Sequence, residues 1–277
     1  MSQYLNINKQ IVHLAIDKSI MFKHSELDKA EKLLRDTNYR NFVSCSKINF
    51  AEFISQNLIM YKTATFKEWL DYFDMDCRVS QHLLDNLIKF ERTINSRLSY
   101  IISEMMEASE LSNFEKNELI QMIQSWQRRV QRLKAHEKIK APYDGSKTWE
   151  LIPKMTFGDM KRLLFWLYDY KQDKYFQIVK GYTFLEDLKC TKSRVDEINR
   201  LRNNLAHCRP LTIYLTHGPT RYKPKKNNNK LDNRYRKEAV EFVFNLSPSK
   251  YVFSAREKIF KSSDNYVKIK NSQHNIG

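Results

Sequence analysis

The sequence predicts an all-α protein, and two observations carry that prediction. Only five of the 277 residues are glycine, about 2% against the roughly 7% of average proteins, which disfavours folds rich in tight turns. Apolar residues recur every three or four positions along much of the chain, which is the period of an amphipathic helix. The scattered glycines also form no G-x-G-x-x-G or P-loop pattern, which excludes dinucleotide and P-loop nucleotide sites.

Helices are expected in order along the first half of the chain. Residues 25–28, Ser-Glu-Leu-Asp, have the spacing of a capping box, and an apolar helical face follows them. Residues 66–73 predict a short amphipathic helix. A long helix is expected at about residues 79–108, and a further one at residues 113–140.

The second half is expected to begin with a loop at residues 141–146. The spacing then predicts helices at residues 157–170, 175–188 and 192–208. The last of these should stop there because Arg209 precedes Pro210, and a residue before proline disfavours the helical conformation.

Beyond Pro210 the pattern changes. Residues 212–216 and 239–246 alternate like short strands around a basic, Asn-rich segment, so we expect a flexible or hairpin-like appendage. The predicted organisation is an N-terminal helical accessory region at residues 1–76, a helical core at 77–210 and a basic C-terminal appendage at 211–277.

Composition predicts a soluble, cytoplasmic protein. The longest apolar run, residues 163–168, is far shorter than the roughly 20 residues that cross a bilayer. The first 21 residues lack the apolar core of a signal peptide. The four cysteines form no C-x-x-C pair, which fits a reducing compartment and predicts neither disulfides nor zinc. We expect no cofactor and no membrane contact.

Positive charge is concentrated in three segments. The formal net charge is +16, and residues 128–140, 221–237 and 250–270 together account for all of it. Clustered charge of this kind indicates a polyanionic partner, most often a nucleic acid. The alternative is a set of solvated helix faces and a basic tail.

We expect basic side chains of these segments, and one residue directly after the last core helix, to contact RNA phosphates: Arg128, Arg129, Arg132, Lys134, Arg209, Lys223, Lys225, Lys226, Arg234 and Arg236. Tyr222 and Tyr235 lie among the tail residues. They would stack on unpaired bases or be ordinary exposed tyrosines of a basic linker.

One acidic residue interrupts the apolar stripe of the long helix. Glu91 occupies a position of the 3-4 pattern whose other members, from Leu84 to Met105, are apolar. A buried carboxylate is costly unless a cation or several donors meet it. Two interpretations remain open: Glu91 pairs with a neighbouring basic residue at the edge of the stripe, or it orients a functional arginine, for which Arg202 is the best candidate.

A second pattern lies at the end of the last core helix. Arg202 and His207 form an R-N-x-x-x-H box with Asn203. Histidine can donate or accept a proton near neutral pH, and arginine can hold a phosphate through two hydrogen bonds. These groups suit RNA cleavage without a metal, in which the 2′-hydroxyl attacks the adjacent phosphate. The alternative is a helix end that carries a surface arginine and histidine.

The spacing of this box raises a geometric problem. Five residues span about 500° around a helix, so Arg202 and His207 point about 140° apart if the helix stays regular. Both reach one substrate if the helix end distorts, or if a second copy of the chain completes the site. A two-fold dimer would place one His207 on each side of a phosphate. Asn203 would bind the phosphate or fix the geometry of His207.

Several segments, in order, resemble the Abi abortive-infection family of the AbiD/AbiF type, within the HEPN superfamily. They are the Leu-then-Asn-Tyr segment at residues 34–40, the helix at residues 66–76, the Ile-Lys-Phe-Glu-Arg signature at 88–92 with Arg97-Leu98, the Trp and Thr-Phe-Gly segments at 149–159, and the Leu-Arg-Asn-Asn-Leu-Ala-His box at 201–207.

The resemblance implies an all-α HEPN ribonuclease core, metal-independent RNA cleavage at a composite dimer site, and growth arrest during phage infection. It implies that Arg202, Asn203 and His207 are the catalytic motif and that Glu91 is the family's acidic position. Relatives often continue after the histidine with a basic segment that contains Trp, whereas Cys208 and Arg209 lead here into Pro210.

Three functions therefore stand beside one another. The first is an endoribonuclease toxin of an anti-phage system. The second is a non-catalytic module that holds a structured RNA, or a toxin restrained by an RNA in a toxin–antitoxin pair. The third is a helical interaction protein whose long apolar helices serve oligomerisation, and salt-dependent RNA binding would count against it.

Overall fold

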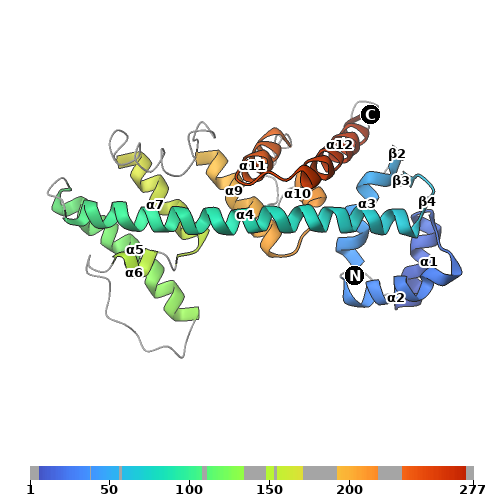
Figure 1. The fold of residues 1–277 in the computed structure, drawn as a ribbon, viewed down its shortest axis with the longest axis horizontal. Coiled ribbons are helices and arrows are strands. Elements are labelled where there is room, and N and C mark those ends of the chain that lie inside the picture. The colour runs from blue at the N-terminus through green and yellow to red at the C-terminus, as the bar shows by residue number, and fades with distance from the viewer. Residues whose placement is uncertain are drawn as a thin grey trace. The chain divides into compact units, whose positions relative to one another are not determined.

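A computed structural model of the chain describes residues 6–37, 39–55, 58–107, 111–133, 148–152, 155–170, 192–217 and 233–272. These residues are overwhelmingly α-helical, with only short strands, so the predicted all-α class is confirmed (Figure 1). The chain divides into two compact units. One comprises Met1–Asn86 and Arg200–Gly277, and the other Leu87–Asn199. The three parts expected from the sequence, residues 1–76, 77–210 and 211–277, do not share the boundaries of these two units.

The first unit opens with helices α1 (Ile7–Asp17), α2 (Leu27–Asp36) and α3 (Tyr39–Phe50). A short 3₁₀ turn, η1 (His24–Glu26), precedes α2. The expected helix after residue 25 is present, but its N-cap is Glu26. The carboxylate of Glu26 accepts a hydrogen bond from the backbone N–H of Lys23 at 2.9 Å, so the capping interaction lies earlier than the predicted box.

This region also contains two small sheets, which the sequence did not predict. The strand β1 (Ile20–Met21) pairs in parallel with β4 (Ala64–Thr65). The antiparallel hairpin β2 (Ala51–Ser55) and β3 (Leu58–Tyr61) pairs Ala51 with Tyr61 and Ser55 with Leu58, with an irregularity after Ala51. The described strands therefore lie in the N-terminal region and not beyond Pro210.

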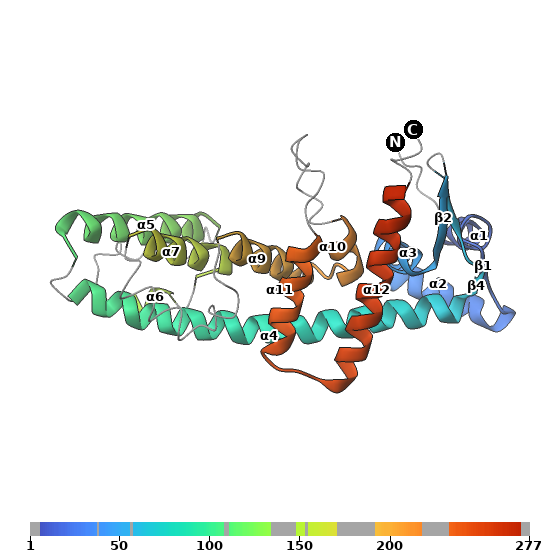
Figure 2. The ribbon, with the colours of Figure 1, turned by 90° about the horizontal axis from the view of Figure 1, so that it is seen from above.

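The longest element is α4 (Phe66–Glu107), a continuous helix of 42 residues (Figures 1 and 2). The sequence predicted two helices here, at residues 66–73 and 79–108, with a separation between them. The separation is absent, since this segment contains no glycine or proline and its residues are all compatible with a helix. One of them, Asp76, is fully buried.

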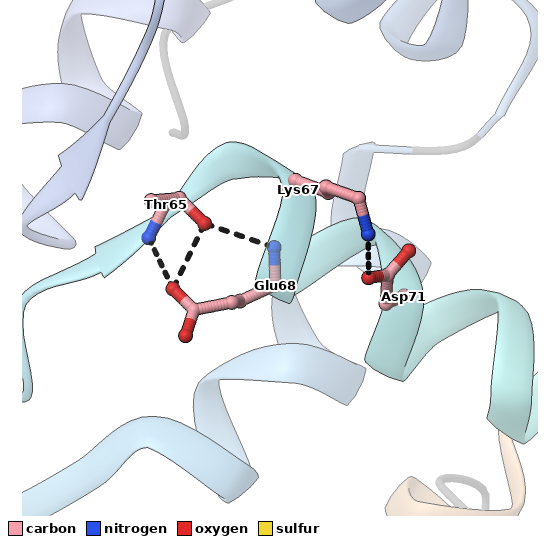
Figure 3. Close-up of polar contacts among 4 residues, drawn as sticks. All are labelled: Thr65, Lys67, Glu68 and Asp71. Atoms are coloured by element: carbon pink, nitrogen blue, oxygen red, sulfur yellow. Dashed lines mark hydrogen bonds and ion pairs between the residues drawn. The ribbon is translucent and has the colours of Figure 1, made fainter.

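A reciprocal capping box starts α4 directly after strand β4 (Figure 3). The backbone N–H and the hydroxyl of Thr65 donate to the Glu68 carboxylate at 2.7 and 2.8 Å, and the Glu68 N–H donates to the Thr65 hydroxyl at 3.2 Å. These donors hold the pKa of Glu68 below its ordinary value. The box satisfies a helix N–H that would otherwise lack a partner.

Aromatic packing holds this N-terminal half of the first unit together. Phe42, Phe66 and Trp69 are almost completely buried. Phe50 stacks on Trp69 with ring centroids 5.2 Å apart, and Phe42 meets Phe73 edge to face at 5.5 Å. The start of α4 is therefore packed against α3.

The C-terminal part of the first unit is helical: α10 (Leu211–His217), α11 (Asn233–Asn245) and α12 (Lys250–Ser272). The predicted strands at residues 212–216 and 239–246 are wrong. In α11 the buried residues include Arg236, Ala239, Val240 and Val243, which is the spacing of one helical face. Tertiary burial therefore overrides the strand-like alternation of this segment.

Helix α12 is an integral part of the first unit and not an appendage. It packs on α3, β2 and α10, where Tyr266 joins a buried cluster with Ile48 and Ala51. The hydroxyl of Ser262 donates to the side-chain oxygen of Asn49 at 2.8 Å. Residues 218–232, which include much of the predicted basic segment, lie outside the described residues.

The second unit contains the remainder of α4, α5 (Asn113–Leu133), α6 (Thr148–Leu151), α7 (Phe157–Tyr170) and the first part of α9 (Lys192–Ala206). The predicted helix at 157–170 is confirmed. Asn95 donates to the carbonyl oxygen of Met155 at 3.3 Å. The predicted loop at 141–146 and helix at 175–188 lie outside the described residues. Among the helices that are described, none combines the length and apolarity needed to span a membrane.

The capping box of α4 predicts a specific pH dependence. Because the pKa of Glu68 is lowered in the folded protein, its contribution to stability is present above the ordinary glutamate pKa of about 4.3 and is lost as the pH falls through the lowered value. Glu68→Ala should therefore lower the melting temperature more at about pH 6 than at about pH 3. Calorimetry of both proteins measures this, and an equal shift at both pH values would contradict it.

Candidate functional site

The R-N-x-x-x-H box lies at the C-terminal end of α9. Arg202 is half-buried, whereas Asn203 and His207 are exposed. The backbone N–H of His207 donates to the carbonyl oxygen of Asn203 at 3.2 Å, so helical hydrogen bonding continues as far as His207. Arg202 and His207 therefore stay about 140° apart around the helix axis. The distorted helix end, one of two alternatives raised by the sequence, is not observed.

The helix ends in a Schellman motif directly after His207. The N–H of Cys208 donates to the carbonyl oxygen of Leu205 at 2.9 Å, and the N–H of Arg209 donates to that of Asn204 at 3.1 Å. Cys208 has a φ of 51°, which is the left-handed conformation that this motif requires and that glycine usually supplies. His207 is therefore the last residue before a sharply defined turn.

Two asparagine side chains donate hydrogen bonds to the backbone of this turn. Asn204 is buried, and its side-chain amide donates to the carbonyl oxygen of Arg209 at 3.0 Å. Asn41, from α3, donates to the carbonyl oxygen of Cys208 at 3.2 Å. The sequence indicated Asn203 as a residue that binds phosphate or fixes His207. In the structure, its neighbour Asn204 holds the backbone beside His207.

A buried carboxylate fixes the chain beyond the turn. The two oxygens of Asp76, in α4, accept hydrogen bonds from the backbone N–H groups of Leu211 and Thr212 at 2.7 and 2.8 Å. The hydroxyls of Thr212 and Ser80 donate to the same carboxylate. Asp76 thus supplies the N-terminal cap of α10, where the positive end of a helix favours an anion.

Burial raises the pKa of Asp76 above its ordinary value, and the four donors oppose that rise. A fully buried carboxylate is tolerated only when its lone pairs are satisfied in this way. Tyr72 completes the arrangement, because the Thr212 hydroxyl donates to Asp76 and therefore accepts from the Tyr72 hydroxyl at 3.2 Å. Asp76 was not predicted from the sequence as a functional position.

Side chains of α4 also bind the C-terminal end of α11 and the turn that follows it. At the end of α11, Asn86 donates to the carbonyl oxygen of Val243 at 3.1 Å. His82 approaches the carbonyl oxygen of Ser247 at 2.9 Å, and because a carbonyl only accepts, the imidazole is the donor. Helices α10 and α11 are therefore each held to α4 through one end.

Arg236 has a different role in the structure from the RNA contact predicted for it. Its side chain is buried, and its guanidinium donates to the carbonyl oxygens of Leu215 and Tyr214 at 3.1 and 3.4 Å. A cation at this position satisfies the negative C-terminal end of α10. Arg236 is therefore a helix cap and does not present its charge to a phosphate.

The other predicted RNA-binding residues have varied positions. Arg128 is exposed on α5, Arg209 is half-buried beside His207, and Arg234 is exposed and paired with Glu238 at 3.0 Å. Tyr235 is also exposed. The remaining residues, or their side chains, lie outside the described part of the structure: Arg129, Arg132, Lys134, Tyr222, Lys223, Lys225 and Lys226.

Glu91 is half-buried in the second unit, on the same helical stripe as the buried Leu87, Ile94 and Leu98. The apolar character of that stripe is confirmed. Arg202 belongs to the first unit. The pairing of Glu91 with Arg202 stays a prediction.

The described cysteines are free thiols: Cys45 is buried, and Cys77 and Cys208 are exposed. Although Cys77 is exposed, partial desolvation of its thiol and the nearby carboxylates of Asp76 and Asp74 raise its pKa to about 12, which disfavours the thiolate that binds metals or attacks electrophiles. Within the described part of the chain, no three His, Cys, Asp or Glu side chains gather as a metal site.

A comparison with protein families now places the chain. A family model described as Abi-like protein matches residues 32–212, which is more than half of the 277 residues. The chain belongs to the Abi-like protein family. No curated protein and no solved structure matches it.

The Abi-like match includes the R-N-x-x-x-H box, Glu91, and the residues that hold the turn after His207. It ends at Thr212, the residue whose N–H and hydroxyl bind Asp76. Helices α11 and α12 lie beyond it. Membership of the family suggests a role in abortive infection.

The left-handed turn predicts the effect of substitutions at Cys208. Glycine adopts this conformation without the steric cost that a β-carbon brings. Cys208→Gly should therefore raise the free energy of unfolding by about 1 kcal/mol, while the β-branched Cys208→Val should lower it. Urea unfolding of the three proteins measures both changes. A glycine variant less stable than the valine variant would show that the turn is not left-handed.

The Asp76 cap predicts a large effect from an isosteric change. Asp76→Asn replaces one acceptor oxygen by an amide that faces a backbone N–H, so a buried donor loses its partner. The expected loss of stability is about 2 kcal/mol. The matched control is Asp74→Asn, an exposed position of the same helix, which should change stability little. Equal effects of the two substitutions in urea unfolding would rule out the cap.

Proposed function

We propose that this Abi-like protein is a metal-independent endoribonuclease toxin of a bacterial abortive-infection system. It would cleave RNA by attack of a 2′-hydroxyl on the adjacent phosphate, leaving 2′,3′-cyclic phosphate and 5′-hydroxyl ends. One observation carries the proposal. His207 presents an exposed imidazole at a helix end whose backbone is hydrogen-bonded on both sides, which is the preorganisation that catalysis needs.

The residues of the box divide the chemistry among them. His207 transfers a proton, as base at the 2′-hydroxyl or as acid at the leaving 5′-oxygen. Arg202 holds the phosphate and the charge that gathers on it. Asn203 is exposed beside them and contributes a further hydrogen bond to the phosphate. Glu91 is proposed to orient Arg202, as the acidic position of the family.

A homodimer supplies the second histidine. One imidazole does not reach both sides of an in-line displacement, and the regular helix end leaves Arg202 and His207 about 140° apart. A two-fold axis near the box would place the His207 of each protomer around one phosphate. The HEPN-like composite site is therefore the assembly that suits this helix end.

The test is cleavage of cellular RNA in excess EDTA by the wild type, His207→Ala and Arg202→Lys. The wild type should cut and leave cyclic phosphate ends. His207→Ala should lose at least about 100-fold in rate, the usual contribution of a general acid or base, and Arg202→Lys should also be slower because lysine does not reproduce the paired hydrogen bonds of arginine to phosphate. His24→Ala, an exposed histidine of the same unit, is the matched control and should keep full activity. Cleavage by His207→Ala at the wild-type rate would reject the proposed mechanism.

Dilution tests the composite site separately. The rate per protomer should fall as the protein is diluted below its dimer dissociation constant, measured by analytical ultracentrifugation. A constant rate per protomer across the monomer–dimer transition would reject the shared site. If the wild type binds RNA tightly and never cuts it, the protein is instead a non-catalytic RNA-binding module.

A further inference from the structure

Helix α12 carries a straight row of exposed lysines. Lys250, Lys258, Lys261 and Lys268 are all exposed. At 100° per residue, their positions fall within an arc of about 80° and extend over about 27 Å of the helix. These residues therefore form one continuous strip, which we term the lysine strip.

The two acidic residues of α12 each bind a cation outside the strip. Glu257 accepts a hydrogen bond from the buried Arg256 at 2.8 Å. Asp264 is paired with Lys237 of α11 at 2.5 Å. Each carboxylate already has a cationic partner, so the outward face of α12 keeps a net positive charge.

The opposite face of the helix is used for packing. Val252, Ile259 and Tyr266 are buried, and α12 contacts α3, β2 and α10. An amphipathic helix that binds a membrane inserts its apolar face into the lipid. Here that face is occupied by the protein itself, so the lysine strip is held rigidly outward and favours a polyanion in solution.

Exposed aromatic rings lie at the N-terminal end of the strip. Tyr251 is 56% exposed and Phe253 is 50% exposed. The guanidinium of Arg78, in α4, lies 5.6 Å from the centre of the Tyr251 ring. That of Arg256 lies 4.8 Å from the Phe253 ring. Cations thus orient two rings that remain open to solvent.

We propose that the outer face of α12 is the surface that binds single-stranded RNA in this protein. The lysine strip contacts successive phosphates, and Tyr251 and Phe253 stack on unpaired bases at one end. A positive track combined with aromatic rings is the usual design of a single-strand site. The assignment rests on the proposed function and deepens it, because α12 lies in the same compact unit as His207.

The first experiment measures the salt dependence of RNA binding in the His207→Ala background, with a fluorescent oligouridylate of about 20 nucleotides. Each phosphate contact adds about 0.7 to the slope of log K against log salt for single strands. The triple change Lys258→Gln, Lys261→Gln, Lys268→Gln should therefore lower the slope by about 2. The matched control Lys29→Gln, Lys32→Gln, Lys62→Gln removes the same charge from exposed positions of the same unit and should leave the slope unchanged.

The second experiment tests the aromatic end. Tyr251→Leu should weaken binding of the oligouridylate roughly 5- to 150-fold, the range for one stacked base, and should leave binding of duplex RNA unchanged. Equal losses for single-stranded and duplex RNA would overturn the stacking assignment. Equal slopes for the two triple variants would overturn the assignment of the lysine strip to RNA. The same assignment would fail if the strip variant lost binding to phosphatidylserine vesicles but kept its RNA binding.

These outcomes are independent of the cleavage test. Full cleavage by His207→Ala would reject the proposed mechanism while a slope change of about 2 would still assign the RNA surface. Conversely, loss of cleavage in His207→Ala with no effect of the α12 changes would keep the nuclease and reject this surface. Circular dichroism of each variant confirms that these exposed substitutions leave the fold intact.

Discussion

The carboxylate of Asp76 is the interaction on which the C-terminal half of the first unit depends. It lies within α4 and accepts hydrogen bonds from the first N–H groups of α10. These bonds hold the chain after the histidine box against this point of the long helix. A buried charge without partners would be too costly to keep. The donors that offset the cost of burying this carboxylate therefore also fix the residue at which α10 begins.

The remaining helix ends follow the same logic. Arg236 meets the carbonyl end of α10, and Asn86 meets that of α11. Both side chains donate hydrogen bonds to backbone carbonyl oxygens, and Arg236 also brings the positive charge that the C-terminal end of a helix favours. Because helix ends carry several unsatisfied backbone groups, these contacts specify the arrangement of α10 and α11 more narrowly than apolar burial alone would.

Long periodic segments were predictable from the sequence, and short ones were not. The helix at residues 157–170 and the apolar stripe of α4 have many repeats of the helical pattern, so local information was sufficient. Residues 212–216 contain β-branched and aromatic residues over a single turn, which suits a strand equally well. They become helical in α10 because Asp76 caps them and α12 and α3 cover them. The hairpin β2–β3 similarly depends on packing that no local pattern records.

In the candidate site, the sequence identified the proposed reactive residues but not the residues that position them. Arg202 and His207 were identified from their spacing and residue types, since proton transfer and phosphate binding restrict the choice of side chain. The residues that position them were not identified. Asn41 and Asp76 are more than 130 positions from the groups they bind, and no periodicity links such positions. The one local signal was Asp76 itself, which lies between the two helices predicted at residues 66–73 and 79–108.

A histidine on a fixed helix end constrains how the proposed activity is regulated. The backbone around His207 is hydrogen-bonded before the turn, within it and after it, so the imidazole is not carried to or from Arg202 by a local change in α9. Switching by refolding the motif would require breaking several hydrogen bonds at once. Association of two protomers and access of RNA require none of these to break. We therefore expect an antitoxin or phage trigger to act on assembly or on RNA binding, and to leave the structure of the histidine box unchanged.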